Sequence, residues 1–152
     1  MKTRIHAIAG GIAFLTILTF WTSTIISELF GSHETIAMVK GLILKGMFIL
    51  VPAMAIVGAS GASLGTNRTD PGVLSKKKRM PIIAANGLLI LIPMAFLLEA
   101  RASAGQFDLW FYMLQGVELI AGAVNLTLMG LNIRDGLRLT GKGKRADLTV
   151  LL

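Results

Sequence analysis

Residues 39–52 read VKGLILKGMFILVP and begin a stretch that is long and apolar enough to cross a membrane. Lys45 lies about ten residues inside this stretch, where an unpaired charge costs about 3 kcal/mol or more on insertion scales. A lysine at such a depth needs either a partner or a function. The rest of the sequence has to supply one of the two.

Four apolar runs follow one another along the 152 residues, at about 5–30, 36–60, 81–98 and 109–133. Each run meets the length of about 20 residues that a transmembrane helix needs. Charged residues make up only 15% of the chain, whereas a soluble domain has about a quarter. Because short connections make consecutive helices antiparallel, we predict an all-α, integral membrane four-helix bundle with up-down-up-down topology. The first run is too long for the apolar part of a signal peptide, so we expect it to remain as the first helix.

Lysine and arginine are concentrated on one side of this predicted bundle. The N-terminus, the segment 61–80 and the segment 134–152 together carry twelve Lys and Arg against three Asp. This positive-inside pattern places both termini in the cytoplasm, with a bundle at residues 1–135 and a basic cytoplasmic tail at 136–152. The SKKKR run at 75–79 is then a topology signal that contacts anionic lipid headgroups. Since topology accounts for the net charge of +7, we predict no nucleic-acid partner.

Glu118 offers a partner for Lys45. Both residues lie about ten residues from the outer ends of their helices, so both sit roughly 15 Å deep at 1.5 Å per residue. We therefore predict an intramembrane pair of Lys45 and Glu118. The fourth apolar run also carries polar and small residues in a 3-4-3-4-3 spacing, Gln115, Glu118, Gly122, Asn125, Met129 and Asn132. This spacing places them on one stripe that faces the bundle interior.

Asn86 in the third run lies at a depth similar to that of Asn125, so the two amides can form a hydrogen bond. The predicted seam of Asn86, Gln115 and Asn125 has three interpretations. Together with the Lys45–Glu118 pair it either holds helices in register, or provides a proton or cation site at Glu118, or binds a cofactor, a lipid or a larger partner.

The histidines and methionines raise the question of haem. The chain has no cysteine and only two histidines, which are separated by almost a full membrane span. His6 lies at the cytoplasmic end of the first helix, and we predict Met54, Met80 and Met129 near the same boundary. A His/Met pair can hold haem iron, and histidine with thioethers suits Cu(I). His6 is accordingly the candidate metal ligand, with haem b as the candidate cofactor.

The stretches KKKRMPIIAANGLLILIP (76–93) and AGAVNLTLMGLNIRDGLRLTG (121–141), with the opening IHAIAGGIAFLTILTFW (5–21), resemble an uncharacterised group of small bacterial four-helix inner-membrane proteins. The resemblance covers most of the chain. It implies a bacterial source, a multi-pass location in the inner membrane and the same topology, and it transfers no catalytic residue.

We therefore predict a small protein of the bacterial inner membrane without enzymatic activity of its own, forming a homo-oligomer or part of a larger membrane complex. The first functional hypothesis is a haem-binding or accessory electron-transfer protein. The second is a small proton-coupled transporter in which Glu118 carries the proton and Lys45 is its counter-charge. The third is a purely structural subunit of a membrane complex.

Overall fold

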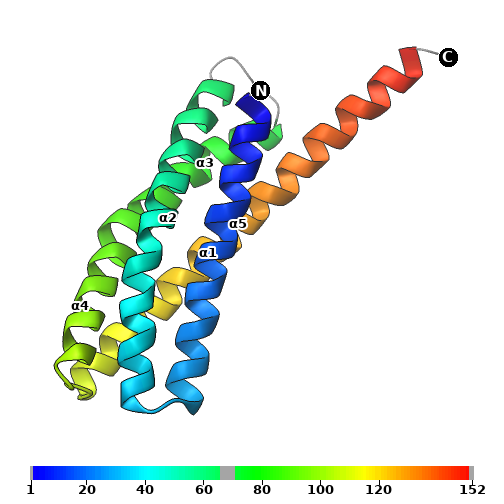
Figure 1. Cartoon of the computed structure of the whole chain (residues 1–152). Helices are drawn as coiled ribbons and strands as arrows, with labels where there is room; N and C mark the ends of the chain where they lie inside the picture. The colour runs from blue at the N-terminus through cyan, green and yellow to red at the C-terminus, as the bar shows by residue number, and fades with distance from the viewer. Residues whose placement is uncertain (1, 66–70, 151–152) are drawn as a thin grey trace.

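The computed structural model describes residues 2–65 and 71–150, with the side chains of residues 3–65, 71–138 and 141. All regular structure in these residues is helical (Figure 1). The elements are α1 (Lys2–Phe30), α2 (His33–Gly65), α3 (Pro71–Asn86), the π-helix η1 (Gly87–Leu91), α4 (Ile92–Ser103) and α5 (Leu109–Val150). Arg68 and the tail residues Lys142, Lys144 and Arg145, which the charge pattern assigns to the cytoplasmic side, lie outside the described side chains.

Within the described residues, four helical stretches are long and apolar enough to cross a membrane. They are Thr3–Phe30, His33–Gly65, Pro71–Ser103 and Leu109–Arg138. This confirms the prediction of an all-helical fold with four candidate spans and indicates a multi-pass membrane protein. Many large apolar side chains point outward, including Leu29, Phe48, Leu89 and Ile120. A helix that is apolar on its outer face as well as its inner face is expected where that outer face meets lipid.

The third span differs from its prediction. It begins at Pro71 and runs through Pro81, whereas the apolar run predicts a start at about residue 81. The added turns contain the SKKKR run, which gives no hydropathy signal although lysine and arginine are good helix formers. Further along, the ring of Pro93 would clash with a carbonyl one turn earlier, and the π-helix η1 precedes it. In η1 the backbone N–H of Ile92 bonds to the carbonyl of Gly87, so the chain stays helical through the proline.

The last helix also extends beyond its predicted end near residue 133. α5 continues without a break to Val150, through the predicted start of the tail at residue 136. Figure 1 shows this C-terminal part leaving the other helices as a single extended helix. Hydropathy marks where an apolar run ends, and the helix continues because the following basic residues are themselves good helix formers.

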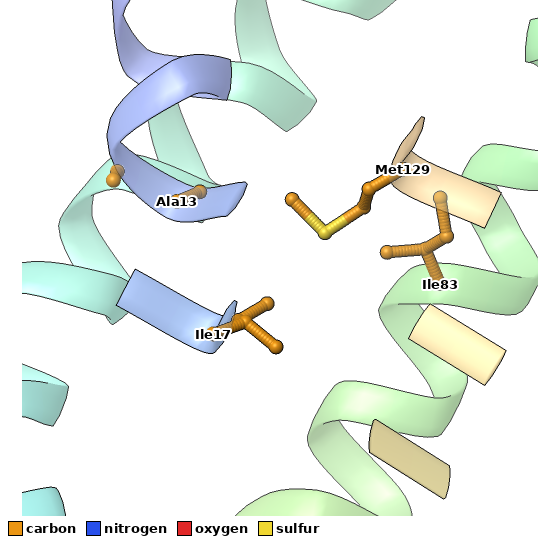
Figure 2. Packing of buried hydrophobic residues seen from close by; sticks show 5 residues of the cluster. Ala13, Ile17, Ile83 and Met129 are labelled. Carbon is orange, nitrogen blue, oxygen red and sulfur yellow. The ribbon is translucent and has the colours of Figure 1, made fainter. Parts of the chain in front are cut away.

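Two apolar clusters form the core. The Met129 cluster consists of Ala13, Ile17, Ala53, Ile83 and Met129. Figure 2 shows the Met129 side chain between Ala13 and Ile17 of α1 and Ile83 of α3. The Phe111 cluster lies toward the other end of the bundle and consists of Ile36, Leu98, Ala102, Phe111 and Leu114. Along α5, the buried polar residues lie between these two clusters.

Candidate functional site

Lys40 of α2 is one of the most deeply buried side chains in the described part of the chain, with 1% of its surface exposed. It follows Ile36 by four residues and precedes Ile43 by three, and both of these are also buried. This 4-3 spacing places the three residues on one helix face, which is turned toward the bundle. Lys40 Nζ lies 2.5 Å from Glu118 Oε2 of α5, whose side chain is 13% exposed.

Gln115 extends this pair along α5. Its Nε2 donates a hydrogen bond of 2.9 Å to Glu118 Oε2, the same oxygen that binds Lys40. The Gln115 side chain is 3% exposed, and its Oε1 is buried with no hydrogen-bond partner among the described residues. The amide therefore orients the carboxylate of Glu118 and leaves one carbonyl oxygen unpaired beside it.

Glu28 of α1 contributes a second carboxylate to the same region. Its Oε1 is buried and has no hydrogen-bond partner in the described structure. Lys40, Glu118 and His33 all interact with it electrostatically. The sequence analysis does not identify Glu28, because a carboxylate near the end of the first apolar run is equally consistent with an exposed position at the helix end. The signal that locates it is its position one turn after Thr24, which is 2% exposed.

A cavity of about 60 Å³ borders this site. Glu118 and Gly122 of α5, Trp21 and Thr24 of α1 and Leu91 of η1 are among its lining residues. The indole Nε1 of Trp21 donates to the backbone carbonyl of Leu119 at 2.9 Å, which fixes the ring against α5. A Cβ atom on Gly122 would lie only 2.8 Å from Trp21 Cδ1, so a glycine is needed for this close approach. At about 10–15 Å³ for each water, the cavity has room for a few molecules.

The structure differs from the predicted Lys45–Glu118 pair, since Lys40 occupies that position. The side chain of Lys45 is exposed on the outer surface of α2 and makes no ion pair or hydrogen bond with the described residues. The two lysines are five residues apart, which rotates them about 140° around a helix with 3.6 residues per turn. Equal depth was therefore not sufficient for pairing, because the helix face decides which lysine points inward.

The structure brings Asn86 and Asn125 together. Asn86 Nδ2 donates to Asn125 Oδ1 at 2.9 Å and to the backbone carbonyl of Ala121 at 2.8 Å. Asn125 is 1% exposed, and its Nδ2 donates to the carbonyl of Ile83. These bonds join α3 to α5 immediately before the π-helix begins. Gln115, in contrast, bonds to Glu118 rather than to either asparagine.

The four predicted cofactor ligands do not converge. A Cβ atom on Gly61 would lie 3.1 Å from Met80 Sδ and 3.2 Å from His6 Cε1, so the thioether and the imidazole approach the same point. Met129 belongs instead to the Met129 cluster, and Met54 packs against that cluster. His6 lies seven residues before Ala13 of the cluster, which is about 10 Å along a helix axis. Of the three predicted methionine ligands, Met80 is therefore the one that lies near His6.

His6 forms a side-chain hydrogen bond with α2. Its Nδ1 lies 2.8 Å from Ser60 Oγ, and the Ser60 hydroxyl donates to the backbone carbonyl of Ile56. Since that hydroxyl has a single proton, Nδ1 is the donor toward Ser60, and Nε2 carries the free lone pair. Within the described residues there is no group of three or more His, Cys, Asp or Glu that could hold a metal ion.

The chain matches no protein-family model, no curated protein and no solved structure. The fold and the site therefore define only a class, a multi-pass helical membrane protein with a buried ion pair. Any function has to be argued from the site itself.

Proposed function

We propose that the chain is a small proton-coupled transporter of the bacterial inner membrane, with up-down-up-down topology, both termini in the cytoplasm, and Glu118 as the residue that takes up and releases the proton. The observation that carries this proposal is the buried contact between Lys40 and Glu118. Lys40 here has the role of counter-charge that the sequence had assigned to Lys45. A lysine opposite the carboxylate limits the charge change when Glu118 gains or loses its proton.

The cost of removing the two charges from water favours a functional role for the Lys40–Glu118 pair over a purely stabilising one. Removing two charges from water costs several kcal/mol per ion, so a buried pair often stabilises a fold no better than apolar residues of similar volume. Ionisable groups inside a membrane commonly mark ion or proton pathways. Glu118 lines the adjacent cavity of about 60 Å³, so its carboxyl group is not enclosed by packing on every side.

Proton flux in liposomes tests this proposal. Purified protein is reconstituted with a pH-sensitive dye inside the vesicles, and a pH step or a membrane potential drives the flux. Glu118→Gln keeps the size and the hydrogen-bonding shape of the side chain but cannot ionise, so we expect flux to fall to the level of empty vesicles. Glu99→Gln is the matched control, because Glu99 lies at the outer end of α4, where it accepts a hydrogen bond from Ser103. Flux that survives Glu118→Gln would refute the proposal.

The proposed orientation has its own test. The chain has no cysteine, so single cysteines can be introduced without background labelling. An impermeant maleimide added to intact cells should label a cysteine at Gln106, in the connection between α4 and α5, and should leave one at Leu137 unlabelled until the membrane is opened. The opposite labelling pattern would invert the topology.

A contact with anionic headgroups is proposed for the basic part of α3. Lys78 is exposed there, whereas Arg79 is turned toward α5 and contacts Asp135 Oδ2 at 2.7 Å. Arg79 therefore serves mainly to join the two helices. Lys78 is the residue of this run that we propose for the contact with the headgroups.

A second candidate function is binding of haem b or Cu(I) at His6, and the approach of Met80 to His6 beside Gly61 favours it. The free Nε2 and the thioether are suitable ligands for either group. The about 60 Å³ cavity is lined by neither residue, so a macrocycle would have to bind at the surface of the bundle or between two copies of the chain. Absorption spectra of oxidised and reduced protein, expressed with added haem, test the haem, and copper analysis of protein loaded with Cu(I) tests the copper, which has no visible band in that state. A Soret band that His6→Ala removes and Glu118→Gln leaves in place is expected for haem, and a featureless spectrum would exclude it.

Lys45 supports the proposal that the protein works in a larger membrane assembly. Its side chain lies twelve residues from the start of α2 and twenty from the end, about 18 and 30 Å along the axis, within the apolar part of the helix. An ammonium in that position is stabilised by an acidic partner. Since the described carboxylates of this chain lie in the bundle interior or near the helix ends, we propose that a different membrane protein supplies one.

A further inference from the structure

The site around Glu118 contains more acidic than basic groups. Glu28 and Glu118 are two carboxylates, and Lys40 is the cation that contacts one of them. With all three groups ionised the cluster has one excess negative charge. His33, which also interacts with Glu28, stacks on the ring of Phe107 at the outer end of the bundle, with 4.0 Å between ring centroids. A site of this composition has a place for one further positive charge.

Two buried oxygens in the cluster have no hydrogen-bond partner among the described residues. They are Glu28 Oε1 and Gln115 Oε1. The second belongs to a side chain that is 97% buried, and the other end of the same amide is bonded to Glu118. A buried acceptor without a donor is unfavourable and is uncommon in folded proteins. Acceptors in excess of donors are expected where a proton or another small cation enters the site.

We propose that Glu28 is a second proton-accepting residue, which receives the proton from Glu118 and passes it toward the outer face. In this step the O–H bond at Glu118 breaks as an O–H bond forms at Glu28, with no other change in bonding. Thr24 and Glu118 line the same cavity, and Glu28 follows Thr24 by one turn of α1. The Oε1 atom of Glu28, which has no hydrogen-bond partner among the described residues, is the acceptor for the proton. His33 is the next titratable group toward the outer end.

This inference rests on the proposed function of Glu118 and deepens it, so its test must separate the two. In the liposome assay we expect Glu28→Gln to lower the proton flux at least ten-fold and Glu28→Asp, which retains the carboxyl group, to restore most of it. Glu34→Gln is the matched control, because it removes an exposed carboxylate at the same end of the bundle. If Glu118→Gln abolishes flux and Glu28→Gln does not, the role of Glu28 is refuted and that of Glu118 stands. If Glu118→Gln leaves the flux intact, the proposed function fails first.

A spectroscopic test is independent of transport. Infrared difference spectra across a pH titration detect the carbonyl stretch of a protonated carboxylic acid, and we expect a buried band that Glu28→Gln removes or reduces. Trp21 lines the same cavity, so its fluorescence in a Trp110→Phe background should follow the same titration. An unchanged band in Glu28→Gln would overturn the proposal even if that variant transported poorly. Flux that requires Na⁺, with choline as the replacement ion, would assign the site to a metal cation and overturn the proton relay.

Discussion

The two faces of α2 place the same kind of residue in opposite surroundings. On the inward face, Lys40 is 1% exposed and contacts a carboxylate, between the buried residues Ile36 and Ile43. On the outward face, Lys45 is exposed among apolar side chains such as Leu42, Phe48 and Ile49. Five residues along a helix separate an internal ion pair from a lysine on the outer surface of the bundle. The position of a membrane lysine around its helix is therefore as informative as its depth.

This comparison gives the two lysines different roles. Lys40 has its partner within the chain, so its loss should first affect the folded bundle and the chemistry of Glu118. Lys45 has no partner among the described residues, so its loss should first affect what binds to the bundle from outside. The predictions below test this division, beginning with the inward face.

Lys40→Met should have the largest effect on stability. The substitution keeps an unbranched side chain of similar length but leaves the carboxylate of Glu118 buried without its cation. Breaking a buried ion pair in this way costs about 3–5 kcal/mol. Thermal or detergent-induced unfolding of the purified protein should show the loss. Lys78→Met, at an exposed position of α3, is the control and should leave the unfolding curve unchanged.

The double variant Lys40→Met/Glu118→Leu distinguishes the pair from its individual charges. Replacement of both partners by apolar residues leaves no uncompensated charge, so we expect most of the lost stability to return. The same variant should have no proton flux. If it were as unstable as Lys40→Met alone, packing of the lysine stem rather than the charge would be its main contribution.

Lys45→Leu should act in the opposite direction. Insertion scales assign about 3 kcal/mol to a lysine at the centre of a membrane helix, so the isolated bundle should become more stable or remain unchanged. The proposed external partner should be lost, and cross-linking in native membranes followed by size analysis would detect this. Lys45→Arg should retain the partner. If the complex survived Lys45→Leu, binding of the partner to the outward face of α2 would not depend on the charge of Lys45.

The four spans were predictable because each requires only a sufficiently long apolar run, and the structure contains all four. Other parts required information that hydropathy does not contain. The basic turns between Pro71 and Pro81 are helical without being apolar, so the start of the third span was missed. Lys40 and Glu28 were assigned to the outer side by their distance from the helix ends. The Ile36–Lys40–Ile43 spacing locates the first of them, whereas the unpaired oxygen of Glu28 is visible only after α1, α2 and α5 pack together.

Asn125→Leu should have a smaller effect than the changes at Lys40 and Lys45. Asn125 bonds to Asn86 at 2.9 Å, and interhelical hydrogen bonds in membranes contribute about 0.6 kcal/mol on average and up to about 1.7 kcal/mol. Because Asn86 also donates to the carbonyl of Ala121, its amide is not left without a partner. We expect a loss of about 1 kcal/mol in unfolding experiments, with proton flux retained. A loss as large as that of Lys40→Met would mean that the asparagines also position the helices around Glu118.

Asp108→Asn should produce the smallest effect, limited to the pH dependence of stability. Asp108 Oδ1 accepts a hydrogen bond of 2.9 Å from the backbone N–H of Phe111 at the start of α5, and Oδ2 contacts Arg101. The hydrogen bond from Phe111, followed by the bond and the charge of Arg101, lowers the pKa of this carboxyl below its ordinary value of 3.8. The carboxylate therefore contributes stability that is fully present above that ordinary value and is lost as the pH falls through the lower pKa of the folded protein.

Thermal unfolding of wild type and Asp108→Asn, measured from neutral pH down to below pH 3.8, checks this sign. Asparagine can still accept the hydrogen bond that begins α5, so the variant isolates the charge from the cap. The variant should be slightly less stable than wild type at neutral pH, and the two curves should converge as the wild-type carboxylate is protonated. Glu34→Gln provides the control, because it removes another exposed carboxylate from the same end. If the stabilities of wild type and variant kept the same difference down to acid pH, the contribution of Asp108 to stability would come from its shape rather than from its charge.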